Sequence, residues 1–524
     1  MQPLLPMKSR PNEGQANLSR HLWSKKVAAV LAVVVLALVV ILPVNSAMRA
    51  PVSPQDEGLL LVYPTLIMHG GVANKSFESA YGQATYWTIA AAFAVAGSSV
   101  VVERSVGLLY ELILVTSLVA LVSRRRGLIV GCLAGSFPAI LEVNIGLSAL
   151  AWMGALALAS FGLVLVDSIL CSSHLNQRRQ LSLLFAAGVC FGLSISYRLD
   201  FAFPVTLLFI PLVVTRNRDA TRLIPGMVVG LVPLIVNFFQ AGPSAVFRGE
   251  FFQPVFTIHA GRYLPIGFVS RSLLLTSGFV IAGAIVVTFV GYLVWRQETH
   301  SKDRVTLIMV GLFDIGLLPQ ALQRMDVLHV DLISGFIFAS LFLIPLAINW
   351  LVLLGVLLLM SLNLRAYSGA VFQSLGFRPD PEYVVSNEGR SVTVQSASYQ
   401  TDLKELIHSV DFRSHKGERI FVGPSDMRRT NLNDTFLYFL FPTLTPGSYY
   451  LEMEPGVANA ANSHLASDVA HSQLLILTTR YNNWQEPNSS SVYGSSSAND
   501  VVATRFKMVG EWGPWSLLRR KIQM

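Results

Sequence analysis

The sequence predicts a polytopic α-helical membrane protein with about eleven transmembrane helices and a small C-terminal α/β domain outside the cytoplasm. Hydrophobic residues make up 52% of the 524 residues and charged residues only 13%, whereas soluble domains carry about 25% charged residues. Long apolar runs recur from near the N-terminus to about residue 364, and a run of about 20 residues can cross a membrane. Beyond residue 391 the apolar runs are short and alternate with polar segments, as in a soluble α/β domain.

The orientation of the spans follows from the distribution of basic residues. Lys and Arg cluster on alternate connections, for example at Arg124 to Arg126 and at Arg178 and Arg179, and such clusters mark cytoplasmic loops. We therefore expect a plasma-membrane protein with a cytoplasmic N-terminus. Because the number of spans is odd, the C-terminal domain is expected outside. The predicted spans are 27–44, 105–122, 127–141, 147–170, 181–197, 201–215, 222–239, 272–295, 305–319, 330–348 and 350–364.

Two apolar segments have alternative interpretations. An extra span at 86–102 would move Arg124 to Arg126 to the outside, so we expect this stretch to lie in the outer interface or to be only partly inserted. Tyr86 and Trp87 at its start suit that depth. The segment 27–44 can also be interpreted as a cleaved signal peptide, although its apolar run is longer than a usual signal core of about 7–15 residues. Cleavage there would not change the later topology.

The net charge of +8 does not indicate a nucleic-acid partner. From residue 367 onward the chain has 14 basic and 15 acidic residues, so the basic excess lies entirely in the membrane part, where orientation requires it. The C-terminal domain contains none of the three cysteines, Cys132, Cys171 and Cys190, which excludes a disulfide framework or a cysteine-based zinc site there.

The chain divides into a membrane domain at 1–366, a polar linker at 367–391 and a domain at 392–524. The membrane domain has a long first outer loop, 45–104. In the last domain we expect strands and helices in alternation, and the absence of a nucleotide-binding glycine motif favours a role in binding an acceptor or partner. The expected strands are 419–423, 447–453 and 473–479, and the expected helices are 398–411, 432–441 and 457–471.

The first outer loop is far longer than two spans need, and long loops in compact proteins are often functional. It opens with Pro54-Gln55-Asp56-Glu57-Gly58, only about twelve residues beyond the first span. Two acids so close to the membrane could simply be solvated. However, they are followed in order by Tyr63-Pro64, His69-Gly70-Gly71, Phe77-Glu78 and Tyr81-Gly82.

This loop resembles the first outer loop of the GT-C superfamily of membrane glycosyltransferases, in the branch that contains protein O-mannosyltransferases and aminoarabinose transferases. Tyr81-Gly82 is followed here by Gln83, where that branch has Pro. Two later stretches extend the resemblance to about residues 20–370. They are Gly192-Leu193 with Tyr197-Arg198-Leu199-Asp200 and Pro204, and Leu318 to Asp326 with His329.

The resemblance implies transfer of a sugar from a polyprenyl-phosphate donor to a glycan, lipid or protein acceptor at the outer membrane face. Phosphate leaves without being protonated, so one base for the acceptor hydroxyl suffices for a single inverting displacement, and a cation must stabilise the departing phosphate. Asp56 is the predicted base and Arg324 the predicted cation. The further predicted substrate-binding residues are Glu57, Glu78, Tyr81, Arg198, Asp326 and His329.

Several interpretations stay open at this point. Some branches of the family use a divalent cation and others do not, and no spacing of His, Asp or Glu in this chain dictates a metal site. The loop 240–271, with His259 and Arg262, can be a lid over the donor or an interfacial anchor. The intramembrane acids Glu111, Glu142 and Asp314 are either structural or functional. The competing functions are a transporter or flippase of lipid-linked sugars, which would usually show internal repeats, and a surface-polysaccharide polymerase or ligase.

Overall fold

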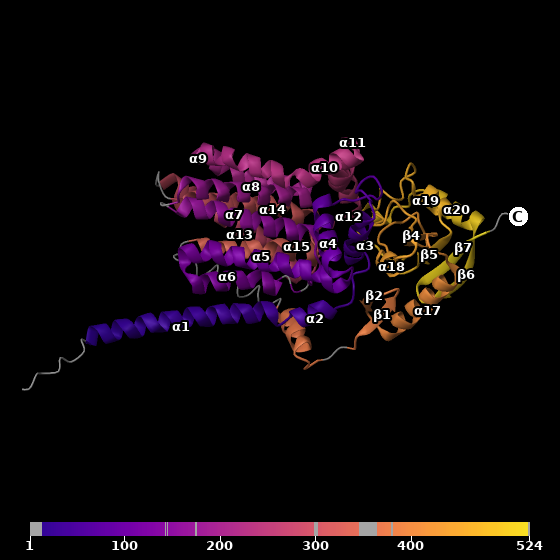
Figure 1. Ribbon diagram of the computed structural model, residues 1–524, viewed down its shortest axis with the longest axis horizontal. Helices are drawn as coiled ribbons and strands as arrows, with labels where there is room; N and C mark the ends of the chain where they lie inside the picture. The colour runs from indigo at the N-terminus through magenta and orange to yellow at the C-terminus, as the bar shows by residue number, and fades with distance from the viewer. Residues whose placement is uncertain are drawn as a thin grey trace, which may run out of the picture.

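The computed structural model describes residues 13–141, 143, 145–172, 175–297, 302–344, 364–378 and 381–521. A bundle of long helices forms one body, and a domain of strands and short helices covers one end of it (Figure 1). Helices α3 (Asp56–Met68) and α4 (Gln83–Ala96) lie between the two. One cluster of buried apolar residues runs from the bundle through α3 into the C-terminal domain, so the junction is packed as a continuous core.

The bundle confirms the prediction of a polytopic helical membrane protein. Seven helices are long and apolar enough to cross a membrane, and three shorter apolar helices accompany them in the described part of the chain. The predicted span 350–364 lies outside the described residues except for its last position, and so does the end of 330–348. The bundle helices are α1 (Glu13–Ile41), α5 (Val100–Arg126), α6 (Leu128–Leu141), α7 (Ala151–Cys171), α8 (Gln177–Tyr197), α9 (Ala202–Gly230), α10 (Val232–Ala241), α13 (Arg271–Gln297), α14 (Lys302–Gln323) and α15 (Val327–Ser340).

The long helix α9 contains a chain reversal at Arg216, whose backbone is not helical (φ −140°, ψ 51°). Its second half runs parallel to α8, because Gln180 bonds Asp219 at one end and Ser196 bonds the carbonyl of Gly230 at the other. The predicted spans 201–215 and 222–239 are therefore the two arms of a hairpin, and α10 continues the second arm. Glycine permits close packing here: a Cβ on Gly192 would lie 2.2 Å from the carbonyl oxygen of Met227.

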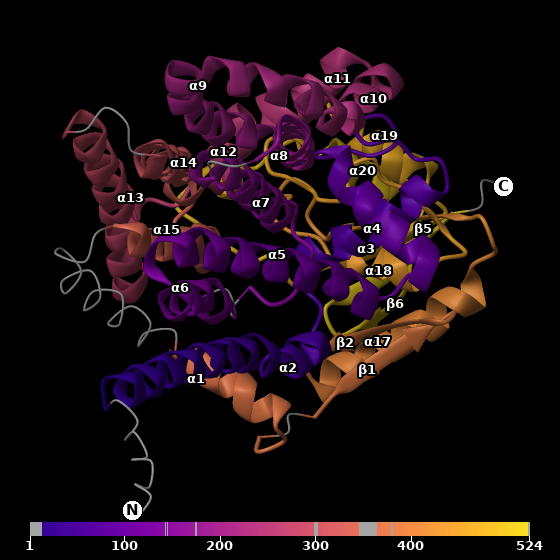
Figure 2. The same cartoon turned by 60° about the vertical axis from the view of Figure 1, so that its left-hand side comes forward.

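The stretch 86–102 is not one helix. Helix α4 ends at Ala96, and the backbone turns at Gly97 with φ +86° before α5 begins at Val100. Tyr86, Ile89 and Phe93 are buried, so α4 packs against protein. The helix lies near the end of the bundle that faces the C-terminal domain (Figure 2).

The C-terminal domain is built on a mixed five-stranded sheet with the order β4-β3-β5-β7-β6. Strand β3 is parallel to β4 and β5, whereas β7 is antiparallel to β5 and β6. A separate hairpin of β1 and β2 begins inside the segment expected to be a linker. The strands are β1 (Tyr383–Asn387), β2 (Arg390–Val394), β3 (Arg419–Pro424), β4 (Thr445–Pro446), β5 (Leu474–Thr478), β6 (Phe506–Trp512) and β7 (Trp515–Arg520).

The expected elements of this domain are only partly present. Strands at 419–423 and 473–479 and the helix at 398–411 match β3, β5 and α17 (Ala397–Arg413). The stretch 447–453 is irregular instead of a strand, and its last residue, Met453, has a left-handed backbone (φ 59°). The two other expected helices are shorter than predicted, α18 (Phe436–Leu440) and α19 (Leu465–His471), and α20 (Ser497–Arg505) precedes β6.

Candidate active site

A cavity of about 490 Å³ lies at the junction of the bundle and the C-terminal domain. Its wall combines the start of α3, the turn after α8, the segment 250–263, the connection from α14 to α15, and three stretches of the C-terminal domain. Six of the predicted site residues line it: Asp56, Tyr81, Arg198, Arg324, Asp326 and His329. The structure thus brings together residues that are up to about 270 positions apart in the chain.

Asp56 is the first residue of α3, and its carboxylate is open to the cavity although it lies deep within the protein. The C-terminal domain fixes the residues before it. The backbone N–H of Asn433 donates to the side-chain oxygen of Gln55 at 2.9 Å, and the N–H of Phe436 donates to the carbonyl of Pro54 at 3.0 Å. Burial raises the pKa of Asp56, and the nearby Arg262 guanidinium and the Ser53 hydroxyl offset part of that rise.

Glu57, the next residue, does not line the cavity. Its carboxylate accepts two hydrogen bonds from Arg104, at 2.5 and 2.8 Å, and both side chains are almost fully buried. Arg104 also donates to the carbonyls of Ala47, Met48 and Ala50. This arrangement ties the beginning of the first outer loop to α5, and it leaves Glu57 without access to the cavity.

Arg262 ends the short helix α12 (His259–Arg262) and faces the cavity. Its Nε donates to Glu454 at 2.8 Å, and its Nη2 is buried without a hydrogen-bond partner. An unpaired buried donor is costly unless a ligand completes it. Arg262 therefore places a cationic group with an unpaired, buried donor near Asp56, where sequence reasoning expected only a residue of a lid or anchor.

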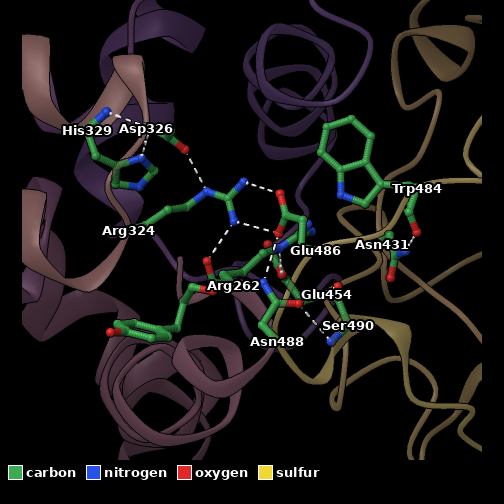
Figure 3. A network of polar contacts seen from close by, with 11 residues as sticks. Arg262, Arg324, Asp326, His329, Asn431, Glu454, Trp484, Glu486, Asn488 and Ser490 are labelled. Carbon is green, nitrogen blue, oxygen red and sulfur yellow. Dashed lines mark hydrogen bonds and ion pairs between the residues drawn. The ribbon is translucent and has the colours of Figure 1, made fainter. Parts of the chain in front are cut away.

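Arg324 commits four of its five N–H donors within the protein (Figure 3). Its Nε donates to Asp326 at 2.6 Å, its Nη1 donates to the carbonyl of Arg262 at 2.6 Å, and both terminal nitrogens bond Glu486 at 2.7 and 2.9 Å. Burial opposes its charge, but the Glu486 and Asp326 carboxylates raise its pKa overall. The guanidinium thus remains charged and joins three separate segments.

Asp326 caps helix α15 by accepting from the backbone N–H of His329 at 2.9 Å. The same oxygen lies 2.7 Å from Nδ1 of His329. Burial alone would raise the pKa of Asp326, but the hydrogen bonds from His329 and the charge of Arg324 lower it to about 2. These two residues therefore form a fixed, hydrogen-bonded corner of the cavity.

Tyr81 and Arg198 form a second pair in the wall. The Arg198 guanidinium lies 5.4 Å from the centre of the Tyr81 ring and is ion-paired with Asp200 at 2.7 Å. Glu78 lies behind this wall with both carboxylate oxygens buried and without hydrogen-bond partners. Burial and the charge of Glu454 raise the pKa of Glu78 to about 8.

The C-terminal domain contributes a wall that sequence reasoning missed. Asp434 accepts from Tyr481 and Trp515 at 2.8 Å each and pairs with Arg480 at 3.5 Å, so it holds two of the lining residues in place. No motif marked these positions, although Leu432 lies in a segment expected to be helical, 432–441, and Glu452 in one expected to be a strand, 447–453. The lining residues from this domain are Leu432, Glu452, Glu454, Arg480, Tyr481 and Trp484.

The segment 240–271 forms a further part of the wall. It folds as α11 (Pro243–Phe247), a wide helical segment at Arg248–Ile258 and α12. Phe251, Pro254 and Val255 line the cavity, whereas Phe252 and Phe256 are strongly exposed. The wall is therefore mostly apolar on this side, with Glu250 as an acidic residue, and neighbouring aromatic rings are exposed.

The remaining candidate groups lie elsewhere. Asp314 accepts from Ser340 at 2.8 Å inside the bundle, and neither it nor Glu111 lines the cavity. Glu142 lies outside the described residues. Within the described ranges, no group of three or more His, Cys, Asp or Glu side chains is arranged to hold a metal ion.

No protein-family model matches the chain, and no curated protein matches it either. Solved structures do. The fold is similar to that of ArnT. ArnT from Cupriavidus metallidurans in the apo state aligns over 94% of this chain and 98% of its own, with a TM-score of 0.57 and 12% identity. The same protein bound to undecaprenyl phosphate aligns over 93% and 97%, with a TM-score of 0.55 and 13% identity.

A second similar structure is the oligosaccharyltransferase of Archaeoglobus fulgidus in the apo form. It aligns over 93% of this chain and 74% of its own, with a TM-score of 0.51 and 9% identity. The resemblance to the GT-C superfamily that the motifs indicated is thereby confirmed at the level of the fold. At these identities the likeness covers the arrangement of the helices and of the terminal domain, and the chemistry has to be argued from the cavity.

Proposed function

We propose that this protein is a glycosyltransferase that transfers a hexosyl or pentosyl group from a polyprenyl-phosphate donor to an acceptor at the outer face of the plasma membrane. One observation carries the proposal. The cavity between the two domains contains a carboxylate, Asp56, and a guanidinium, Arg262, that is the largest charged influence on it and has an unpaired donor.

The reaction needs these two groups and few others. Asp56 removes the proton of the acceptor hydroxyl while the oxygen attacks the anomeric carbon of the sugar, and the bond from that carbon to the phosphate oxygen breaks. Arg262 stabilises the charge that develops on the leaving phosphate. Arg324 was the residue expected to do this from sequence, but four of its five N–H donors are engaged within the protein, so we assign it the support of Arg262.

The apolar side of the cavity suits the carrier. Phe251, Pro254 and Val255 give a hydrophobic wall, and the exposed Phe252 and Phe256 of the same segment suit an interfacial position. A polyprenyl chain can remain in lipid while its phosphate reaches the cavity. ArnT, which shares this fold, has been crystallised with undecaprenyl phosphate, and this supports the choice of carrier.

The experiment uses the purified full-length protein in detergent with a panel of polyprenyl-phosphate hexoses and pentoses. We expect release of polyprenyl phosphate that depends on an added acceptor, because chemistry needs no sealed compartment. Asp56→Asn should lower turnover at least about 100-fold, the scale of a lost general base, while polyprenyl phosphate still binds. If the protein moves lipid-linked sugars between leaflets of vesicles but transfers none in detergent, it is a flippase and the proposal fails.

A further inference from the structure

Glu486 belongs to the C-terminal domain but bonds a residue of the membrane domain 162 positions away. Its two carboxylate oxygens accept from the terminal nitrogens of Arg324 at 2.7 and 2.9 Å, which is the two-pronged geometry that guanidinium and carboxylate groups favour. The Glu486 side chain is only 5% exposed. Asn488 donates both to Glu486 and to the backbone carbonyl of Tyr263, at 2.9 Å each (Figure 3). These bonds hold the loop that carries Glu486 against the segment that carries Arg262.

The Arg324 guanidinium, held by Glu486, also binds the backbone of Arg262. Its Nη1 donates to the backbone carbonyl of Arg262 at 2.6 Å. The turn Ser489–Ser491 in the same loop packs against α12, the helix that ends at Arg262. Among the described residues, the Arg262 side chain makes one hydrogen bond, from its Nε to Glu454. Both carboxylates that hold Arg262, directly or through Arg324, therefore come from the C-terminal domain.

We propose that Glu486 is a positioning residue for the transfer reaction, which acts by holding Arg324 on the backbone of Arg262. This inference rests on the proposed function, because it gives Arg262 the task of stabilising the leaving phosphate. The C-terminal domain then completes the catalytic site and is more than a binding module. Glu486 itself does not line the cavity, so it acts on the reaction through the two arginines.

The physical reason is the loss of orientation. Without the Glu486 carboxylate, both terminal nitrogens of Arg324 lose a charged acceptor, and within the described part of the chain Asp326 is the one acidic partner left. The guanidinium is then free to turn toward Asp326 and release the Arg262 carbonyl. A displacement of about 1 Å in a group that stabilises a transition state can lower turnover by as much as 100-fold.

The test compares Glu486→Gln with wild type in detergent. Gln keeps the size of the side chain but removes its charge. We expect kcat for transfer from the polyprenyl-phosphate sugar that wild type uses to fall at least about tenfold, with KM changed less than about threefold, because Arg262 contributes mainly in the transition state. Unchanged kcat in a folded Glu486→Gln protein overturns the inference. Lack of transfer by wild type overturns the proposed function instead.

A matched control exists in the same chain. Glu382, directly before β1, also joins the C-terminal part of the chain to Arg49 of the first outer loop, at 3.0 Å, but both side chains are exposed and away from the cavity. Glu382→Gln should keep wild-type kcat. If it lowers kcat as much as Glu486→Gln does, the effect is general loosening of the domains and the inference fails.

A double variant tests whether Glu486 acts through Arg262. If it does, Glu486→Gln should lower kcat by less than about twofold in an Arg262→Lys background. That background already lacks the two-pronged guanidinium of Arg262 that Glu486 is proposed to position. If the double variant loses kcat by the product of the two single-variant factors, the inference is contradicted. If Glu486→Gln does not fold, Asn488→Ala removes a donor to Glu486 and keeps the ion pair. It should lower kcat by about threefold in the same background-dependent way, and full activity would contradict the inference.

Discussion

Asp56 and Glu57 are neighbours in the chain, but only Asp56 reaches the cavity, while Glu57 accepts two hydrogen bonds from the buried guanidinium of Arg104. An acidic pair that looks uniform in sequence is therefore divided between a site and a structural ion pair. Helix geometry explains the division, because consecutive residues at a helix start project about 100° apart, and α3 begins at Asp56.

The first prediction separates the two acids by the same chemical change. Glu57→Gln should lower the unfolding temperature in detergent, because removing one charge of a buried pair costs about 3–5 kcal/mol. The protein that remains folded should transfer sugar at a wild-type kcat. Asp56→Asn is the matched control, and it should lower kcat while keeping the unfolding temperature close to that of wild type. A folded Glu57→Gln protein that has lost turnover would return Glu57 to the substrate-binding residues expected from sequence.

The second prediction concerns pH. Burial raises the pKa of Asp56 and Arg262 lowers it in part, so removing the positive charge should raise it further. Because the base works only when ionised, turnover falls on the acid side as Asp56 becomes protonated. Arg262→Gln should therefore move the acid limb of the kcat–pH profile to higher pH, whereas Arg262→Lys should move it less. Turnover measured as a function of pH for the two variants checks this. If the acid limb does not move in Arg262→Gln, the charge of Arg262 does not affect the ionisation of Asp56.

The third prediction is the topology. Cys171 is exposed at the end of α7, next to the basic clusters expected in the cytoplasm, whereas Ser76 is exposed in the first outer loop. In intact cells, a membrane-impermeant thiol reagent should label Ser76→Cys and leave Cys171 unlabelled until the membrane is opened. Cys132 and Cys190 are buried and should stay silent in both cases. Labelling of Cys171 from outside would reverse the assigned orientation.

Much of the membrane domain could be predicted because hydropathy and length determine a span almost alone. The hairpin at Arg216 was visible in the sequence as two apolar runs, which correspond to its two arms. The break of 86–102 at Gly97 was not predicted, because hydropathy carries no information about a single left-handed glycine in an apolar stretch.

The active-site candidates show a different limit. Asp56 and the Arg324–Asp326–His329 group were found because they belong to local motifs. The roles of Glu454, Glu486 and the unpaired donor of Arg262 could not be found, since they depend on contacts between segments roughly 160 to 200 residues apart. Charge pairing across a domain junction leaves no periodicity in the chain. The irregular stretch that carries Glu452 and Glu454 alternates like a strand, and tertiary packing overrides that pattern.

The last prediction concerns Glu78, which was expected to bind substrate and lies buried behind the cavity wall with both carboxylate oxygens unpaired. Its pKa is raised to about 8 in the folded protein by burial and by Glu454. The folded state therefore holds this proton over a range in which the unfolded chain, with an ordinary pKa of 4.5, has lost it. Stability contributed by the protonated group is present below about pH 4.5 and declines as pH rises toward 8.

Glu78→Gln resembles the protonated form at every pH, so its unfolding temperature should match wild type near pH 4.5 and exceed it at pH 8. Glu405→Gln, on the exposed face of α17, is the control and should follow the wild-type curve. A series of thermal unfolding curves from pH 4.5 to 8 checks this, and parallel curves for Glu78→Gln and wild type would mean that Glu78 is ionised in the folded protein and needs a cationic partner there.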